Sequence, residues 1–287
     1  MNKRFVIKTI VLTCMVLIVN ACNKDYVEFK DMQNRKVKIP KQIERVVCLS
    51  PGVSELFYEF NIQDKLVGRS SFAYLPKEIQ SKPVCGEIYR LDTTAILQAQ
   101  PDLVISSEVI PWNERRFLAR NDIPLFIFKS NKVFTDIYPA IEIFGKIFDK
   151  NKQAKDLIEK LQKKEKQLNQ SSKKNKKKVY YVVGYGNKIN LTVNGSQLIG
   201  DIIKKAGLVN IAENDADMKY ELSDLQSQDP YYIIVSTKDY EDFIKRPPYM
   251  FLSAVRNDRV IPIDNHLLNS LSVSNLTALE QIIKATD

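Results

Sequence analysis

Short continuous apolar runs, separated by stretches with helical spacing, constrain the fold of this chain more than any other feature. Four such runs occur in the first half, at residues 46–49, 66–68, 103–105 and 125–128. Strands of a parallel sheet are buried on both faces, so their sequences are continuously apolar rather than alternating. After the first run, Ser50 and Pro51 predict a helix that has Ser50 as its N-cap. The pattern therefore predicts an α/β lobe.

A second lobe of the same kind is predicted in the last third of the chain. Its expected elements are strands at residues 179–183, 232–235 and 260–263, a helix at about 196–206, and a final helix from about 274. Between the lobes, apolar residues with helical spacing predict helices at 135–148 and at about 151–170. Twenty residues of helix span about 30 Å, long enough to cross from one lobe to the other. We therefore expect an α/β fold of two lobes joined by a single long backbone helix.

The two lobes share a local motif. Residues 97–101 precede the expected strand at 103–105, and residues 225–230 precede the expected strand at 232–235. In both places a helix is expected to end next to a proline and to lead into a buried strand. The correspondence suggests that the lobes arose by duplication.

The N-terminus indicates export. Lys3 and Arg4 precede an apolar run from Ile10 to Val19, which is too short to span a bilayer and is typical of a secretory signal. The following Val-Asn-Ala-Cys at 19–22 is similar to a bacterial lipobox, in which the cysteine receives a diacylglycerol. We expect residues 1–21 to be removed and Cys22 to anchor the protein to a membrane. In a two-membrane cell the sequence does not decide between the inner and the outer membrane. The alternative is an ordinary signal followed by an incidental cysteine.

After this processing the chain keeps two unmodified cysteines, Cys48 and Cys85. Both lie in apolar, strand-like contexts. Buried free thiols are therefore expected, with a bridge between the two as the alternative.

The net charge of +9 is confined to one region. Residues 146–178 contain thirteen lysines and four acidic residues, so the rest of the chain is neutral overall. No aromatic residues are interleaved with these lysines as a nucleic-acid platform would require, which favours a solvated helix face. We expect no nucleic-acid partner, and binding to an anionic surface is the alternative.

The residue types present argue against catalysis. His266 is the only histidine, which excludes a metal site built from several imidazoles. The sequence has no G-x-S-x-G, P-loop or paired-carboxylate pattern. We expect a binding protein with no enzymatic activity, and a lipid-anchored hydrolase is the remote alternative.

Several segments, in this order and spacing, resemble a known family. They are residues 45–51 with Ser54 and Glu55, then 96–105 and 123–126, then Ala206-Gly207, Asp229-Pro230 and 255–260. They look like the substrate-binding proteins of ABC importers for vitamin B12 and other corrinoids, ferric siderophores and haem, over most of residues 45–285. The resemblance implies a ligand cleft between the two lobes and limited hinge motion. It also implies an importer permease as partner, a metal-chelate ligand as cargo, no cofactor of the protein's own, and a monomer.

The family's importer docking residues are replaced here. The resemblance implies one surface glutamate per lobe, seven residues before the proline that leads a strand. Those positions are Thr94 and Ser223, and neither is acidic. Asp92 and Glu221, two positions earlier in each lobe, are the expected substitutes. The alternative is an orphan scavenging or sensing protein that does not dock on a standard permease.

Ligand contacts are expected at the carboxyl ends of the strands, which face the crevice in α/β lobes. The candidate residues are Ser50, Tyr89, Trp112, Arg115, Arg116, Tyr185 and His266. In the family an aromatic residue at the place of Trp112 stacks on a flat ligand, and packing against its own helix is the alternative. One of the two arginines is expected to meet a carboxylate or phosphate of the ligand, with surface solvation as the alternative.

Two further features are assigned to the cleft. His266 could coordinate iron or cobalt as an axial ligand, or donate a hydrogen bond, or be a polar loop residue. The N-terminus of the helix that begins at Ser50-Pro51 would favour an anionic group through its exposed N–H groups.

The predicted organisation has five parts. These are a signal peptide at 1–21, a lipid-anchored tether with a short hairpin at 22–44, an N-terminal α/β lobe at 45–134, connecting helices at 135–178 and a C-terminal α/β lobe at 179–287. The hairpin pairs 27–29 with 37–39 across a turn at 33–35. We expect an exported, lipid-anchored protein that faces the periplasm or the cell surface and delivers a metal chelate to an ABC importer.

Overall fold

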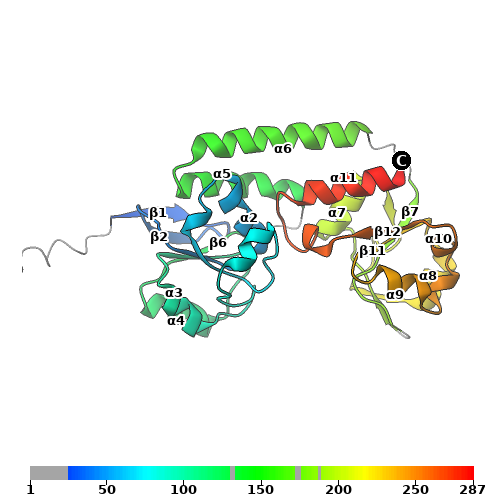
Figure 1. The fold of residues 1–287 in the computed structure, drawn as a ribbon, viewed down its shortest axis with the longest axis horizontal. Coiled ribbons are helices and arrows are strands. Elements are labelled where there is room, and N and C mark those ends of the chain that lie inside the picture. Colours follow the sequence, from blue (N-terminus) through cyan, green and yellow to red (C-terminus); the bar gives the residue numbers. More distant parts are fainter. Residues whose placement is uncertain (1–24, 130–132, 172–175, 187–188) are drawn as a thin grey trace, which may run out of the picture.

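The computed structural model describes residues 25–129, 133–171, 176–186 and 189–287. Two α/β lobes lie side by side, and one long helix, α6 (Asn151–Ser171), runs along the same side of both (Figure 1). The expected fold class is confirmed. The predicted signal peptide and Cys22 lie outside the described residues.

The N-terminal lobe is built on a four-stranded sheet with the order β4-β3-β5-β6. Its strands are β3 (Val46–Cys48), β4 (Leu66–Arg69), β5 (Leu103–Ser106) and β6 (Leu125–Ile127). All neighbouring pairs are parallel. These strands coincide with the four apolar runs, because a strand in this position has no solvent-facing side.

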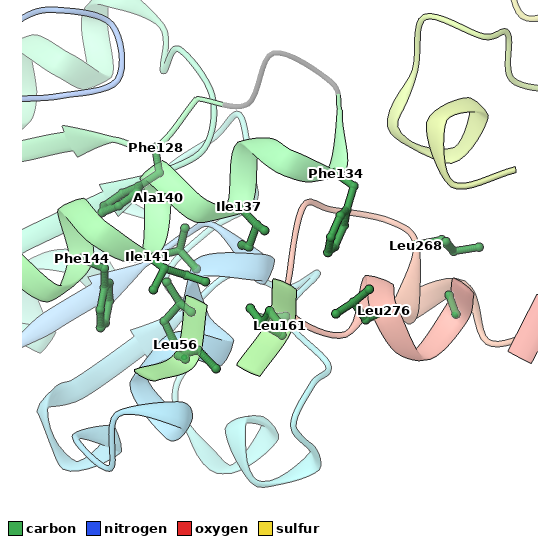
Figure 2. Packing of buried hydrophobic residues seen from close by; sticks show 14 of the residues in the cluster. Leu56, Phe128, Phe134, Ile137, Ala140, Ile141, Phe144, Leu161, Leu268 and Leu276 are labelled. Atoms are coloured by element: carbon green, nitrogen blue, oxygen red, sulfur yellow. The ribbon is translucent and has the colours of Figure 1, made fainter. Parts of the chain in front are cut away.

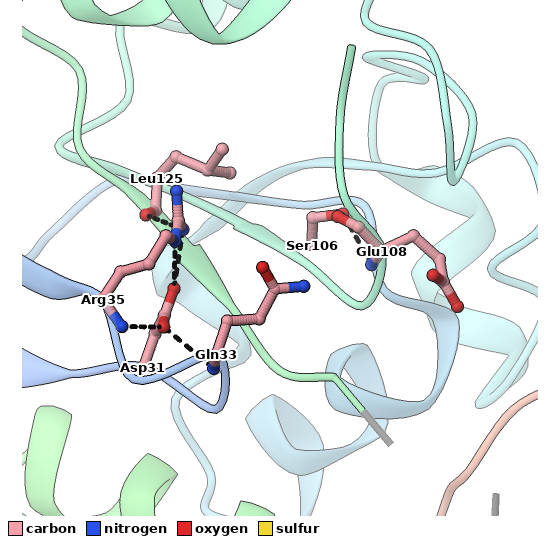
Figure 3. Close-up of polar contacts among 6 residues, drawn as sticks. All are labelled: Asp31, Gln33, Arg35, Ser106, Glu108 and Leu125. Atoms are coloured by element: carbon pink, nitrogen blue, oxygen red, sulfur yellow. Dashed lines mark hydrogen bonds and ion pairs between the residues drawn. The ribbon is translucent and has the colours of Figure 1, made fainter. Parts of the chain in front are cut away.

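The predicted hairpin is present and extends the N-terminal lobe. β1 (Tyr26–Lys30) and β2 (Lys36–Pro40) pair antiparallel. Buried Asp31 holds the turn, since its carboxylate accepts hydrogen bonds from the N–H groups of Gln33 and Arg35 and from Nε of Arg35 (Figure 3). Nη2 of Arg35 donates to the carbonyl of Leu125 at the start of β6. The hairpin is thereby fixed to the edge of the sheet.

The C-terminal lobe has a parallel sheet with the order β12-β11-β7-β9. Its strands are β7 (Lys178–Tyr181), β9 (Val209–Asn210), β11 (Tyr232–Ser236) and β12 (Val260–Ile263). A separate antiparallel pair joins β8 (Ile189–Leu191) to β10 (Lys219–Glu221). The sequence did not predict β8, β9 and β10, because such short strands carry too little apolar pattern to stand out.

The helices cover the two sheets. They are α2 (Pro51–Glu59), α3 (Thr93–Ala99), α4 (Trp112–Arg120), α5 (Ile137–Ile147), α6, α7 (Leu198–Lys205), α8 (Leu222–Gln228), α9 (Tyr240–Lys245), α10 (Ser253–Arg256) and α11 (Asn275–Thr286). Ser50 is the N-cap of α2, and its hydroxyl accepts from the N–H of Val53 at 3.4 Å. Both the cap and the first residue of α2 are as predicted.

The repeated motif of the sequence is also a structural repeat. α3 and α8 each end in a residue with left-handed backbone, Gln100 (φ 45°) and Asp229 (φ 34°). A proline follows in both lobes, and then a buried parallel strand, β5 or β11. The two lobes therefore share this unit in three dimensions as well as in sequence.

One apolar core passes through both lobes. The cluster joins Leu56 and Phe144 of the N-terminal lobe and α5, Leu161 of α6, and Leu276 of α11 (Figure 2). Smaller clusters fill the opposite face of each sheet. Adjacent strand residues such as Val46 and Val47 point into different clusters, which explains the continuous apolar runs.

Cys48 and Cys85 are both buried and unpaired, as expected. Burial raises the pKa of the Cys48 thiol to about 12 and that of Cys85 to about 11, so both stay protonated at neutral pH. Within the described residues, no helix is long and apolar enough to cross a membrane.

Candidate functional site

The carboxyl ends of the two parallel sheets adjoin each other. Tyr74, in the segment after β4, stacks on His266, in the segment after β12, with ring centroids 4.0 Å apart and an interplanar angle of 26°. Because all strands of one parallel sheet end at the same edge, this contact brings the two edges together. The space between these edges is the candidate ligand site.

The N-terminal lobe presents unusually exposed aromatic rings at its edge. Trp112 is 63% exposed and Tyr89 is 62% exposed. The guanidinium carbon of Arg116 lies 5.0 Å from the centroid of the Trp112 ring. Because Arg116 lies one turn further along α4, this contact also fits the alternative in which Trp112 packs against its own helix.

Local hydrogen bonds position the two rings. Ser106, the last residue of β5, bonds through its hydroxyl to both the N–H and the carbonyl of Glu108, which turns the chain towards α4 (Figure 3). Trp112 is the first residue of that helix. The carboxylate of Glu114 accepts from the N–H of Leu91 at 2.7 Å and so ties α4 to the turn that carries Tyr89.

The C-terminal lobe presents a hydrogen-bonded cluster instead. The hydroxyl of Tyr185, just after β7, donates to Asp242 at 2.6 Å. Asp242 also pairs with Arg246 at 3.0 Å, and that guanidinium lies 5.4 Å from the Tyr185 ring. The Tyr185 ring packs edge-on against Phe243 and Tyr249.

These contacts explain the titration behaviour of the cluster. Burial and the hydrogen bond to Asp242 raise the pKa of Tyr185 to about 12. The hydrogen bonds from Tyr185 and Arg246 lower the pKa of Asp242. At neutral pH the cluster therefore keeps a neutral phenol, a carboxylate and a guanidinium.

Asp242 and Arg246 were missed in the sequence, although a signal was present. They lie four residues apart, the spacing of an ion pair on one helix face. The segment also follows the carboxyl end of β11, which is the edge where ligand contacts were expected.

His266 is engaged within the protein. Its ring stacks on Tyr74, and its backbone N–H donates to the Asp264 carboxylate at 2.9 Å. Across the described residues, no group of three histidine, cysteine, aspartate or glutamate side chains is placed to hold a metal ion.

Ser50 and the start of α2 correct an expectation. Ser50 is only 2% exposed and its hydroxyl is used as the cap. A Cβ on Gly52 would lie 1.9 Å from the carbonyl oxygen of Leu271, so this backbone covers the first turn of α2. The N–H groups there are not open to an anionic ligand, because the 271–272 segment occupies the space.

The two neighbouring arginines of α4 lie in different surroundings. Arg116 accompanies Trp112, whereas Arg115 lines a cavity between α4 and the β1–β2 hairpin. The structure therefore associates Arg116 with the aromatic edge and places Arg115 elsewhere.

A second contact joins the lobes behind the Tyr74–His266 stack. The Glu55 carboxylate of α2 accepts from the N–H of Ser274 at 3.2 Å and from its hydroxyl at 2.7 Å. Glu55 is 6% exposed, and burial raises its pKa to about 7. It lines a cavity of about 500 Å³ together with Leu75 and Leu267, so both lobes contribute to this wall.

The substitute docking acids occupy equivalent places. Asp92 is the N-cap of α3 and Glu221 is the N-cap of α8, and both are exposed. Asp92 accepts from the N–H of Ala95 at 3.0 Å, while the Glu221 side chain makes no capping bond. α3 and α8 both lie on the side of their lobes away from α6 (Figure 1).

The chain has a two-lobed α/β fold with aromatic and charged side chains at adjoining sheet edges. Residues 46–267 match the family model described as periplasmic binding protein. The chain therefore belongs to the periplasmic binding protein family, and the resemblance found in the sequence is confirmed.

Individual relatives are distant but cover most of the chain. An uncharacterized ABC transporter substrate-binding lipoprotein, YvrC of Bacillus subtilis, is 22% identical over 90% of this chain and 85% of its own. The vitamin B12-binding protein of Vibrio parahaemolyticus is 24% identical over 84% and 88%. The crystal structure of the periplasmic haem-binding protein HutB of Vibrio cholerae superposes with a TM-score of 0.75 at 19% identity, over 84% of this chain and 98% of that one.

Proposed function

We propose that this protein is a lipid-anchored substrate-binding protein that delivers a metal chelate to an ABC importer and catalyses no reaction. The cargo is a corrinoid such as cobalamin, a ferric siderophore or haem. The observation that carries the proposal is the pair of exposed aromatic rings, Trp112 and Tyr89, at an edge where two α/β lobes adjoin. Flat chelates present the kind of surface on which such rings stack.

Each cleft residue has a separate role in this proposal. Trp112 and Tyr89 stack on the chelate from the N-terminal lobe. Arg116, held beside Trp112, meets an acidic group of the cargo. Tyr185 contributes a ring edge from the C-terminal lobe. His266 serves as an axial ligand to iron or cobalt once Tyr74 moves off its ring.

The relatives support the cargo class. The names of the Bacillus and Vibrio proteins describe a transporter lipoprotein, a vitamin B12-binding protein and a haem-binding protein. Cobalamin and haem are both large macrocyclic metal chelates, so an aromatic wall suits either. We propose that the protein acts as a monomer outside the cytoplasmic membrane.

The cargo is tested by titrating the purified protein with cobalamin, cobinamide, haem and a set of ferric siderophores. Trp112 is the sole tryptophan, so its fluorescence reports directly on the candidate site. One chelate class is expected to quench it saturably, with a matching heat in calorimetry. No quenching and no heat with any of these chelates would overturn the cargo assignment.

The anchor is tested on protein extracted from membranes. The intact mass should show a diacylglyceryl addition to a chain that begins at Cys22. Cys22→Ala should release the protein into the soluble fraction. A soluble wild-type protein that is cleaved at another bond would contradict the anchor.

The orphan alternative rests on one observation. The two usual docking positions are Thr94 and Ser223, and both are exposed and uncharged. If Asp92 and Glu221 do not substitute for them, the protein passes its cargo to something other than a standard permease.

A further inference from the structure

A cavity of about 620 Å³ lies between the β1–β2 hairpin and α4, and its lining includes one candidate ligand residue, Arg115. Both walls carry cationic side chains, since Arg35, Lys36 and Lys38 come from the hairpin and Arg115 from α4. Apolar side chains that include Val37 and Leu118 form much of the rest. A wall of this kind suits an amphiphilic anion, because charge and apolar surface are offered together.

Part of this positive charge is unmatched. Arg35 pairs with Asp31 at 2.6 Å, and Lys36 pairs with Glu28 at 3.0 Å. Within the residues that the structure describes, Lys38 forms no ion pair. The acidic residue that lines the cavity is Asp122, so the lining keeps an excess of positive charge.

Arg115 adds a second, independent observation. Its Nε is buried and has no hydrogen-bond partner in the described part of the chain. A guanidinium has only donors, and a buried donor without an acceptor is costly. An anionic oxygen in the cavity would place negative charge beside this guanidinium.

The position of the cavity along the chain suggests the source of that anion. Tyr26, the first residue of β1, lines the cavity and lies four residues after Cys22. Four residues reach at most about 14 Å even when fully extended. An acylated Cys22 therefore holds the cavity close to the headgroups, where the surface potential of anionic lipids acts over roughly a Debye length of 8 Å.

We propose that this cavity binds the phosphate headgroup of an anionic phospholipid in the membrane that holds the anchor. The proposal rests on the lipid anchor of the proposed function. Basic side chains near an anionic bilayer add electrostatic attraction to the hold of a lipid anchor. The bound headgroup would also fix the orientation of the N-terminal lobe relative to the bilayer.

The test uses the chain from residue 22 with Cys22→Ser, so that acylation does not dominate binding. Cosedimentation is measured at low salt with phosphatidylcholine vesicles, with and without phosphatidylglycerol. We expect binding only when phosphatidylglycerol is present. Lys36→Glu with Lys38→Glu should weaken that binding about tenfold or more. Lys204→Glu with Lys219→Glu, the same charge change on exposed lysines of the other lobe, should leave it within about twofold.

Two variants at adjacent positions distinguish binding in the cavity from binding by general surface charge. Arg115→Gln and Arg116→Gln remove the same charge from adjacent positions of α4, but only Arg115 lines the cavity. We expect only Arg115→Gln to lose binding to phosphatidylglycerol vesicles, with unchanged circular dichroism. Equal losses in both, or equal effects of the two lysine pairs, would overturn the proposal.

The anion source and the proposed function are checked separately. If inorganic phosphate displaces the vesicles at low millimolar concentration, the cavity is a site for free phosphate and the membrane assignment fails. Chelate titration of the same variants, together with intact mass of the wild type from membranes, reports on the proposed function without involving the cavity.

Discussion

The two lobes share a plan but differ where they adjoin. At the edge of the N-terminal lobe, Trp112 and Tyr89 are more than half exposed. At the edge of the C-terminal lobe, Tyr185 is held by Asp242 and packs against Phe243 and Tyr249. The repeated unit of α3 and α8 shows that both edges are built on equivalent supports. The difference therefore lies in the loops, and it predicts that one edge contributes mainly to binding and the other mainly to stability.

The largest expected effect tests whether the edge of the C-terminal lobe contributes mainly to stability. Phe243 is fully buried at the C-terminal edge, and Phe72 is 49% exposed at the N-terminal edge. Phe243→Ala should lower the free energy of unfolding by about 3–5 kcal/mol, because it leaves a cavity in the core. Phe72→Ala should change it by less than about 0.5 kcal/mol. Urea unfolding measures both, and similar losses in the two variants would break the comparison.

Glu55 joins the edges and makes stability depend on pH. Its pKa in the folded protein is about 7, against an ordinary value of 4.5, because burial disfavours the charged carboxylate. Folding therefore favours the protonated form. Below pH 4.5 Glu55 makes its full contribution to the free energy of unfolding. This contribution falls by up to about 3 kcal/mol as the pH rises to 7.

The matched variants are Glu55→Gln and Glu59→Gln. Glu55→Gln keeps an oxygen that can accept from Ser274 but cannot ionise. It should flatten the pH dependence of the unfolding free energy between pH 4.5 and 7. Glu59 is exposed, and its charge is the smallest of the influences that shift the Glu55 pKa, so its substitution should leave most of the slope. A slope that persists in Glu55→Gln would show that another group titrates in this window.

The next prediction tests whether the edge of the N-terminal lobe, which carries Trp112, contributes mainly to binding. Trp112→Ala should weaken binding of the cargo by about 1–3 kcal/mol, or roughly five- to 150-fold, with little change in stability. Tyr185→Phe keeps the ring edge and loses the bond to Asp242, so it should lower stability by about 1 kcal/mol and affinity less than Trp112→Ala does. Calorimetry with the chelate that quenches Trp112 measures both affinities. A larger loss of affinity in Tyr185→Phe would reverse the roles of the edges.

The sequence was most informative where the structure of one strand or helix alone determines which residue types it needs. Strands buried on both faces, such as β3 and β5, had to be continuously apolar, and the cap at Ser50 has a local chemical signature. Contacts between distant segments had no such signature. The coverage of α2 by Leu271, the stack of Tyr74 on His266 and the cavity beside Arg115 all depend on how the segments meet in space.

The smallest expected effect concerns two acidic residues at the start of the repeated helices α3 and α8. Asp92 and Glu221 are exposed N-cap residues of α3 and α8, on the side of each lobe away from α6. If these acids dock a permease, Asp92→Asn with Glu221→Gln should reduce cargo uptake severalfold, because exposed charge pairs contribute modestly. Asparagine remains a good N-cap, so the helix end should stay intact. Affinity for the cargo should be unchanged, since neither residue lies among the candidate cleft contacts. Glu159→Gln, which removes an exposed acid from α6 on the opposite side, is the control. Normal uptake by the double variant would favour the orphan alternative, in which the lobes keep equivalent acids without a permease to receive them.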